Sequence, residues 1–280
     1  MRINRVGIFT NKEKPMALTL RDELQDWLIN RSITVTFFDS ANKTNEQAIS
    51  NIDLFVVLGG DGTLLEATRL ASKANVPIVG INLGGLGYMT EINANEMLSA
   101  MESILNGSFS VQKRMMLDVS SPDTKTFSAL NDIVINRGSL ASMVEIETFI
   151  DDNFLTTFKS DGLIIATPTG STAYSLSAGG PIVEPHHNCI IINPICPHTL
   201  TNRPIIFSPD VTIRLRICSE HRSSILLVDG RESFEVNANS DIIIKKSPNE
   251  ASLVASPFNN YFEILRSKLA WSVLPKRPEH

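Results

Sequence analysis

Residues 54–71 constrain the fold more than any other stretch of this sequence, because they place a glycine-rich loop between an apolar strand and a helix. Residues 54–58 form an unbroken apolar run, which is typical of a strand buried on both faces. From Leu64 onward, apolar and small residues recur at helical spacing. The intervening loop, Gly59-Gly60-Asp61-Gly62-Thr63, has glycines that allow positive φ and a close approach to a ligand. This stretch predicts the strand–loop–helix unit of a parallel α/β fold.

The loop is suited to bind phosphate, with one residue that does not fit that role. Backbone N–H groups at Gly59, Gly60, Gly62 and Thr63, with the N-terminus of the following helix, are typical of a phosphate site. Asp61 would repel phosphate, so it is better explained as a base, a metal ligand or a ribose binder. A tight turn with a helix-capping aspartate is the alternative. The loop matches neither G-x-G-x-x-G nor G-x-x-x-x-G-K-[ST], which disfavours a dehydrogenase.

The composition is that of an ordinary globular protein. The chain has 280 residues, 42% of them hydrophobic and 20% charged, and this length favours two domains. A formal net charge of −5 and a pI near 5.6 argue against a nucleic-acid binder or a protein of anionic membranes. They leave room for an anionic small substrate in a local pocket. We therefore predict no nucleic-acid partner and no membrane partner.

Neither the cysteines nor the first residues indicate secretion. Cys189, Cys196 and Cys218 are odd in number and form no C-x-x-C pair, so free thiols are expected. His186 and His187 lie near Cys189, but no further cysteine or histidine cluster completes a metal site, so we predict none. The N-terminus lacks a signal-peptide pattern and no apolar run reaches membrane-spanning length. These features predict a cytoplasmic protein.

The first part of the chain alternates strands with amphipathic helices. Strands are predicted over residues 6–10, 33–38, 54–58 and 76–82, with helical patterns between them. This order predicts an open parallel sheet with helices on both faces, a Rossmann-like fold that binds ligands at the carboxyl ends of its strands. A second glycine-rich loop ends at Tyr88, which could cover a base or ribose or pack between domains.

After Gly107, strand patterns follow one another with almost no helix. Alternating residues over 144–150 and 211–217 indicate strands with one buried face. Shorter strands are predicted over 224–228, 241–245 and 261–265. The second part is therefore predicted to be a mostly antiparallel β-sandwich.

The change of pattern places a domain boundary near Gln112. We predict an N-terminal α/β domain over residues 1–112 and a β-rich domain over residues 113–266. The tail, residues 267–280, has little periodicity and is expected to pack back on the first domain.

One stretch of the β-rich part is not typical of scaffold. A strand ends at Ala166, and small, hydroxylated and glycine residues follow as far as Pro181. This composition suits a chain that passes close to a polar ligand, and a long loop without a ligand is the alternative. Asn131-Asp132 precedes another strand and offers amide and carboxylate acceptors suited to ribose hydroxyls, although such a pair is also common in turns.

The chain resembles the NAD kinase family in motifs of matching order and spacing. The most specific of them is Thr167-Pro168-Thr169-Gly170-Ser171-Thr172-Ala173-Tyr174, together with the Gly59–Thr63 loop and Asn131-Asp132. The G-G-D-G element alone is shared with phosphofructokinases and with diacylglycerol and sphingosine kinases. The match covers essentially the whole chain and also includes Leu83-Gly84-Gly85-Leu86-Gly87-Tyr88, Pro197-His198-Thr199-Leu200 with Arg203-Pro204, and Asp229-Gly230.

The resemblance implies a role for each matched position. Asp61 corresponds to the general base on the 2′-hydroxyl of the adenosine ribose. Two positions depart from the pattern: Ser142 stands where some members carry His, and Arg231 where many carry Gln. The positions that correspond to substrate contacts are Gly62, Tyr88, Asn131, Asp132, Lys159, Asp161, Thr172, Ala173, Tyr174, Ser175, Ser177 and Arg231.

The resemblance also implies the reaction and its partners. Family members phosphorylate NAD to NADP with ATP and a divalent metal ion, Mg²⁺ or Mn²⁺. They are usually homodimers or homotetramers, in which a neighbouring subunit can contribute to the site. A carboxylate can take the proton of the poorly nucleophilic hydroxyl, while metal and N–H groups neutralise phosphate charge.

Two other functions are the alternatives to an NAD kinase. Another G-G-D-G kinase would act on a lipid or a sugar phosphate, and should show an apolar acyl cleft or gathered basic residues. A non-catalytic NAD(H)-binding sensor is disfavoured by the intact Asp61.

Overall fold

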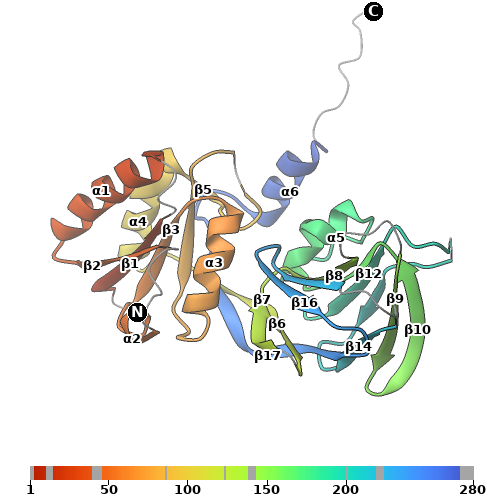
Figure 1. Cartoon of the computed structure of the whole chain (residues 1–280). Helices are drawn as coiled ribbons and strands as arrows, with labels where there is room; N and C mark the ends of the chain where they lie inside the picture. Colours follow the sequence, from red (N-terminus) through yellow and green to blue (C-terminus); the bar gives the residue numbers. More distant parts are fainter. Residues whose placement is uncertain are drawn as a thin grey trace, which may run out of the picture. The chain divides into compact units, whose positions relative to one another are not determined.

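The computed structural model describes residues 3–10, 15–39, 46–85, 87–122, 124–137, 143–199, 201–218 and 224–271. These residues form two compact units (Figure 1). Unit 1 contains the described residues of 1–112 and 252–280, and unit 2 contains those of 113–251.

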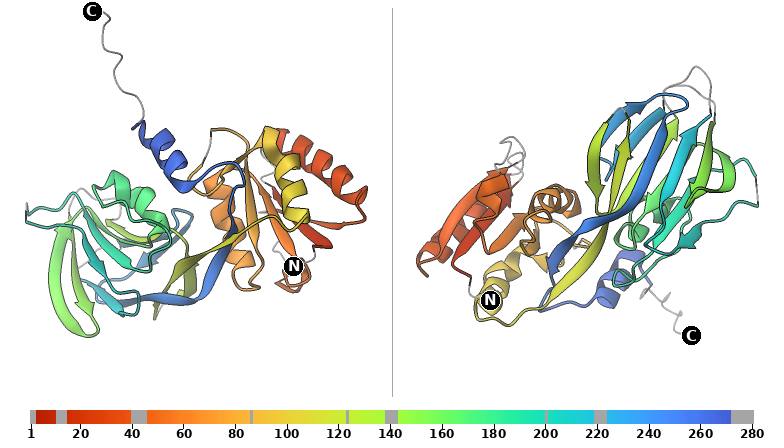
Figure 2. Two further views of the ribbon diagram at one scale, coloured as in Figure 1. Left: turned by 180° about the vertical axis from the view of Figure 1, so that it is seen from behind. Right: turned by 90° about the horizontal axis from the view of Figure 1, so that it is seen from below.

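Unit 1 is built on a parallel sheet in the order β4-β3-β1-β2. Figure 1 shows helix α3 on one face of this sheet, and the reverse view in Figure 2 shows α1 and α4 on the other face. The elements of this unit are β1 (Arg5–Thr10), α1 (Pro15–Ile29), β2 (Thr34–Asp39), α2 (Glu46–Ile49), β3 (Leu54–Leu58), α3 (Asp61–Ala71), β4 (Ile78–Asn82), β5 (Ile92–Asn93), η1 (Ala94–Glu96) and α4 (Met97–Leu105).

The apolar run of β3 follows from its position in the middle of this sheet. Leu54, Val56 and Leu58 pack with residues of α1 and α4 in one core cluster. On the other face, Phe55 makes edge contacts with the rings of Phe9 and Phe38. Because both faces are covered, every residue of the strand is buried, as a central parallel strand requires.

Unit 2 is a sandwich of two mainly antiparallel sheets. One sheet has the order β13-β12-β11-β8-β15-β16, and the other contains β10-β9-β14-β17 with β6 and β7 (Figure 2). Inward-facing residues of both sheets, such as Ile133, Ile165 and Leu215, form a single core. The elements are β6 (Val111–Ser121), β7 (Thr124–Ala129), β8 (Asp132–Arg137), β9 (Val144–Ile150), β10 (Asn153–Ser160), β11 (Gly162–Ala166), η2 (Thr169–Thr172), α5 (Tyr174–Ser177), β12 (Ile190–Ile195), β13 (Ile205–Phe207), β14 (Ile213–Ile217), β15 (Ser224–Val228), β16 (Glu232–Val236) and β17 (Asp241–Val254).

The predicted combination of a parallel α/β part and an antiparallel β-sandwich is confirmed, with one error near the end of the chain. Residues 261–265, predicted as a strand, belong to helix α6 (Tyr261–Leu269). A capping box begins this helix: Asn260 Oδ1 accepts the N–H of Glu263 at 3.0 Å, and Glu263 Oε2 accepts the N–H of Asn260 at 2.9 Å. This reciprocal pair was the overlooked helix signal in the sequence.

Residues 252–271 pack within unit 1, so the part of the chain that returns to this unit begins before residue 267. Ser256 donates its N–H to Glu91 Oε2, and Asn259 Nδ2 donates to the carbonyl of Glu91. The residues after Trp271 lie outside those described. The domain boundary near Gln112 stays a prediction. Among the described residues, no helix is long and apolar enough to cross a membrane.

Candidate active site

Asp61 is the first residue of α3, and its carboxylate is held by the second glycine-rich loop. Oδ2 accepts the N–H of Tyr88 at 2.8 Å, while Oδ1 accepts the N–H of Met89 at 3.1 Å and of Thr90 at 3.0 Å. The Thr90 hydroxyl also donates to Oδ1 at 3.0 Å and accepts from Asn82 Nδ2 at 2.7 Å. The carboxylate is therefore fixed in place. Oδ2 has a single donor in the described part of the chain and keeps the capacity to accept another hydrogen bond.

The helix-capping explanation of Asp61 is wrong. The N-cap of α3 is Gly60, which has an extended backbone, and no side chain of the described residues caps this helix by a hydrogen bond. The expected positive φ is also absent from Gly59, Gly60 and Gly62. Gly59 is instead required by close packing, because a Cβ there would overlap the side chain of Thr63.

Part of the predicted phosphate site is already used by the fold. Gly59 donates its N–H to the carbonyl of Ile81 at 3.0 Å, and Thr63 donates its N–H to the carbonyl of Gly60 at 2.9 Å. A phosphate role for Gly59 and Thr63 stays a prediction. It is disfavoured, because the N–H groups of both residues already donate to backbone carbonyls. Gly60 has open space where a Cβ would stand, which suits a close approach of a ligand to its backbone.

Tyr88 lies beside Asp61 and is half-buried. Burial raises the pKa of its hydroxyl, and the nearby Asp61 carboxylate raises it further. Lys268 Nζ of α6 lies 5.8 Å from the centre of the Tyr88 ring, which is within cation–π distance. Leu86 of the same loop lies outside the described residues.

In unit 2, the Thr167–Tyr174 motif packs over the backbone that leads into β8. The Thr167 hydroxyl donates to the carbonyl of Leu130 at 2.6 Å, and the Thr167 N–H donates to the carbonyl of Asn131 at 2.9 Å. A Cβ on Gly170 would overlap the Asn131 carbonyl. The threonine and the glycine of this motif are therefore required for close packing at Asn131.

Asn131 and Asp132 combine burial with unused hydrogen-bonding capacity. Asn131 is 9% exposed, and no described residue forms a hydrogen bond with its Oδ1. Asp132 is 4% exposed, and burial, together with the nearby carboxylate of Asp229, raises its pKa to about 7. The N–H of Tyr174 partly offsets this effect by hydrogen bonding to Asp132. A buried acceptor without a donor is uncommon in proteins, so these side chains are suited to the hydroxyls of a ligand.

The short helix α5 brings further predicted residues to the same end of β8. Tyr174 is 42% exposed, so its ring does not belong to the core of unit 2. Ser175 is buried, and its carbonyl and hydroxyl accept from Asn193 Nδ2 at 3.0 and 3.3 Å. Thr172 and Ala173 are half-buried and Ser177 is exposed. Of these residues, Ser175 has the clearest structural role.

Lys159 and Asp161 lie at the other end of the central strands of this sheet. In the β8–β11 register, Ala166 faces Asp132 whereas Gly162 faces Asn136, a separation of four residues, or about 13 Å. Lys159 pairs with Glu145 at 2.7 Å, and Asp161 with Arg137 at 3.1 Å. Unit 2 therefore does not bring these two residues together with Asn131 and Asp132.

Asp229 is a residue of this region to which the sequence assigned no role. Its carboxylate accepts the backbone N–H groups of Leu130, Asn131 and Asp132 at 3.0, 2.8 and 3.2 Å. Its signals in the sequence were the Asp-Gly pair after a strand and the match of this pair to the family pattern. Arg231 follows the same turn and is exposed, and Ser142 lies outside the described residues.

Comparisons with known proteins cover both units. The ATP-NAD kinase N-terminal domain matches residues 39–109, and the ATP-NAD kinase C-terminal domain matches residues 130–256. The NAD kinase of Geotalea daltonii is 44% identical over 285 residues, which cover 96% of this chain and 99% of that protein. The NAD kinase of Syntrophotalea carbinolica is 41% identical, with the same coverage.

The chain belongs to the ATP-NAD kinase family.

Solved structures of NAD kinases share this fold. Yeast NADH kinase complexed with NADH has a TM-score of 0.86 at 26% identity, covering all of this chain and 91% of that one. An NAD kinase from Archaeoglobus fulgidus in complex with ATP has a TM-score of 0.77 at 28% identity, covering 94% of this chain and 99% of that one. The predictions of the family, of a kinase and of NAD kinase function are confirmed, which removes the lipid and sugar-phosphate kinase alternatives.

The described part of this ATP-NAD kinase contains few side chains that are arranged to bind a metal ion. No group of three metal-ligating side chains occurs among the residues that the structure describes. His186 and His187 both contact Glu184, at 3.0 and 3.4 Å, and the three cysteines are free.

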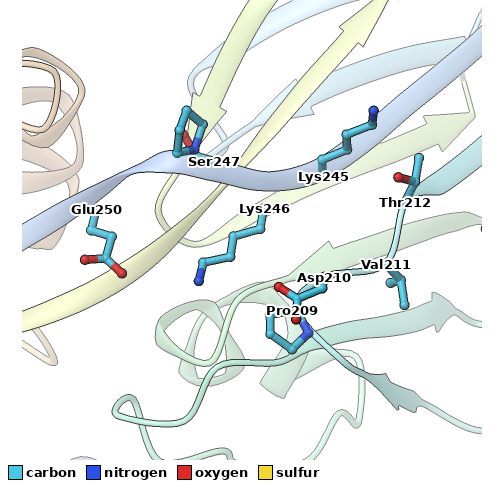
Figure 3. A pocket seen from close by; sticks show the side chains of 9 residues that line it. Pro209, Asp210, Val211, Thr212, Lys245, Lys246, Ser247 and Glu250 are labelled. Carbon is cyan, nitrogen blue, oxygen red and sulfur yellow. The ribbon is translucent and has the colours of Figure 1, made fainter.

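A cavity of about 440 Å³ lies elsewhere in unit 2, on the middle of β17 (Figure 3). Figure 3 shows the Lys246 side chain on the same side of the strand as Asp210 and Glu250. None of the predicted site residues of this ATP-NAD kinase lines it. The cavity is therefore separate from the predicted substrate and phosphate contacts.

Proposed function

We propose that this enzyme transfers the γ-phosphoryl group of ATP to the 2′-hydroxyl of the adenosine ribose of NAD and releases NADP and ADP. The observation that carries the proposal is the buried Oδ1 of Asn131, which has no hydrogen-bond partner among the described residues. Asn131 lies in the part of the chain that matches the ATP-NAD kinase C-terminal domain. A ribose hydroxyl would supply the missing donor. The donor and acceptor substrates accord with the family name and with relatives whose structures contain NADH or ATP.

Asn131 and Asp132 hold ribose hydroxyls in this proposal, because both offer oxygen acceptors in a buried position. Tyr174 packs its exposed ring against the dinucleotide. Thr172, Ala173 and Ser177 border the same ligand, whereas Ser175 supports the helix that carries Tyr174. Arg231, Gly62 and Tyr88 remain proposed substrate contacts that only the family resemblance supports.

Asp61 acts as the general base. Its Oδ2 takes the proton of the 2′-hydroxyl while the hydroxyl oxygen forms a bond to the γ-phosphorus and the bond to the ADP oxygen breaks. The four hydrogen bonds to the carboxylate support this role, because they orient it before the substrate arrives. Gly60 and Gly62 would approach phosphate with their backbone. Mg²⁺ or Mn²⁺ bound with ATP would neutralise the charge on the phosphate groups.

A homodimer or homotetramer would give Lys159 and Asp161 a role. These residues lie about 13 Å along the strands from the Asn131 end, so one copy of unit 2 does not bring them to its own ribose site. We propose that they contact a dinucleotide bound by a neighbouring subunit. A cytoplasmic location stays a prediction.

The test is a coupled assay for NADP formation by the purified protein. NAD is compared with NADH as acceptor, and ATP with inorganic polyphosphate as donor, each with Mg²⁺ and with Mn²⁺. We expect phosphorylation of the 2′-hydroxyl with NAD and ATP, identified by mass and by reaction with an NADP-specific dehydrogenase. A folded protein that binds NAD but forms no phosphorylated product under any of these conditions would instead be a sensor.

A further inference from the structure

We propose that Asp229 is a positioning residue of the dinucleotide site, which holds the backbone of Asn131 and Asp132 in place and makes NAD binding depend on pH. The proposal rests on the ribose-binding role given above to Asn131 and Asp132. It assigns to Asp229 no contact with the substrate.

The geometry shows why an aspartate stands at this position. Asp229 and Gly230 have φ of 51° and 62°, so the turn after β15 is left-handed at both residues. This turn directs the Asp229 side chain at the residues before β8, where its carboxylate accepts three consecutive N–H groups. The Asp229 N–H donates in return to the carbonyl of Asp132 at 2.9 Å. Four hydrogen bonds thus tie one buried residue to the backbone that carries both ribose acceptors.

The charge of Asp229 acts on the side chain of Asp132. Three N–H donors stabilise an ionised Asp229, whereas Asp132 accepts from one N–H, that of Tyr174. Burial and the facing Asp229 carboxylate together raise the pKa of Asp132 to about 7. The packed helix α5 contributes the N–H of Tyr174, which lowers the pKa of Asp132 and only partly offsets these two effects. Asp132 therefore changes protonation close to neutral pH.

The protonation state of Asp132 decides how well it accepts hydroxyl donors. Ionised Asp132 is an acceptor only, which suits ribose hydroxyls, whereas protonated Asp132 places a competing O–H in the site. We therefore expect the KM for NAD to fall as pH rises through about 7. Removing the charge of Asp229 lowers the pKa of Asp132, so the midpoint of this dependence should move to lower pH.

The experiment measures kcat and KM for NAD between about pH 5.5 and 8.5 in the wild-type protein and in Asp229→Asn. In this variant, the side-chain N–H₂ of the asparagine faces backbone N–H donors and cannot accept from them, so the backbone of Asn131 and Asp132 is held less well. We therefore expect the KM for NAD at high pH to rise about tenfold or more, with a smaller change in kcat. The midpoint should move down by about one pH unit. A merely structural loss of stability would not move that midpoint.

Asp151→Asn is the matched control. Asp151 also has a positive φ in a turn of unit 2, and its carboxylate accepts the N–H of Thr212 at 2.8 Å. It lies in the β9–β10 turn and takes no part in the proposed site. The control should keep the wild-type KM and pH profile even if it lowers the melting temperature.

A second variant keeps the test decisive if Asp229→Asn does not fold. Asp229→Glu keeps the charge but displaces the carboxylate, so the KM should rise while the midpoint stays at its wild-type pH. A wild-type protein that makes NADP with a pH-independent KM, or an Asp229→Asn variant with wild-type KM and midpoint, overturns the role of Asp229 and leaves NAD kinase activity standing. Absence of NADP formation in the wild type would instead overturn the proposed reaction.

Discussion

Gly87 lies so close to Asp61 that a Cβ on residue 87 would overlap Oδ1 of the Asp61 carboxylate. The same loop supplies the N–H groups of Tyr88, Met89 and Thr90 to that carboxylate. The two glycine-rich loops of unit 1 therefore form one structure around the proposed base. Its geometry depends on residues that do not take part in the chemistry.

Gly87→Ala should displace the Asp61 carboxylate. A base that is misplaced by about 1 Å loses much of its effect, so kcat should fall by on the order of 10- to 100-fold, with NAD affinity little changed. The measurement is steady-state NADP formation beside calorimetry with NAD. Gly85→Ala is the control, because nothing lies within 4 Å of a Cβ at residue 85. Equal activities of the two variants would contradict the prediction.

Asp61→Asn should separate catalysis from binding. The amide keeps an oxygen for the Oδ1 hydrogen bonds but cannot accept the hydroxyl proton, so turnover should fall by on the order of 10²- to 10⁴-fold while NAD binding is retained. Single-turnover kinetics with excess enzyme measure the chemical step directly. Thr90→Val removes one donor to the carboxylate and leaves the base, so its loss should be far smaller. Near-normal turnover of Asp61→Asn would remove Asp61 from the mechanism.

Tyr174→Ala should weaken NAD binding more than it lowers stability. The ring is 42% exposed, so its removal leaves no core cavity, and the melting temperature should change little. Loss of an aromatic contact with the dinucleotide should raise the Kd for NAD about tenfold. Tyr174→Phe keeps the ring and should bind almost normally. A large drop in melting temperature with unchanged Kd would show that the ring serves folding instead.

Relative to the wild type, the Asp132→Asn variant should become more stable as the pH rises. The folded-state pKa of Asp132, about 7, lies above its value in the unfolded chain, so the folded state binds more protons between the two values. The wild type therefore loses stability as pH rises toward 7, and the asparagine variant does not. Urea unfolding should show the variant gaining about 1–3 kcal/mol on the wild type between pH 5 and pH 8. Asp210→Asn, at an exposed position, should show no such gain.

The elements that could be predicted from sequence are those whose signals are local. The apolar run of β3 and the spacing in α3 depend on near neighbours, and both elements occur where they were predicted. Residues 261–265 were misread because five residues of mixed polarity fit a strand or a helix, and only Asn260 with Glu263 distinguishes the two.

The missed features depend on contacts that join distant parts of the chain. The three hydrogen bonds of the Asp229 carboxylate span 97 to 99 residues, so no spacing rule could reveal them. The separation of Lys159 from Asp132 follows from the register of β8 on β11, which the sequence alone did not predict. The hydrogen bonds from the second glycine-rich loop to Asp61 likewise could not be predicted from the sequence, because they join residues that are 27 to 29 positions apart.

The return of the last described residues to unit 1 bears on the order in which the chain can fold during synthesis. Leu253 pairs with Ile78 at the edge of β4, and Val254 packs in the core of unit 1. Unit 2 is contiguous in sequence and can close its core as soon as it leaves the ribosome. Until the final segment emerges, β4 lacks its β17 partner at Ile78, although β5 already pairs with Ile81 and Asn82. In a chain truncated after Ala251, we therefore expect unit 1 to be the part that proteases and chaperones attack. This should hold even though residues 1–112 of that unit are all present.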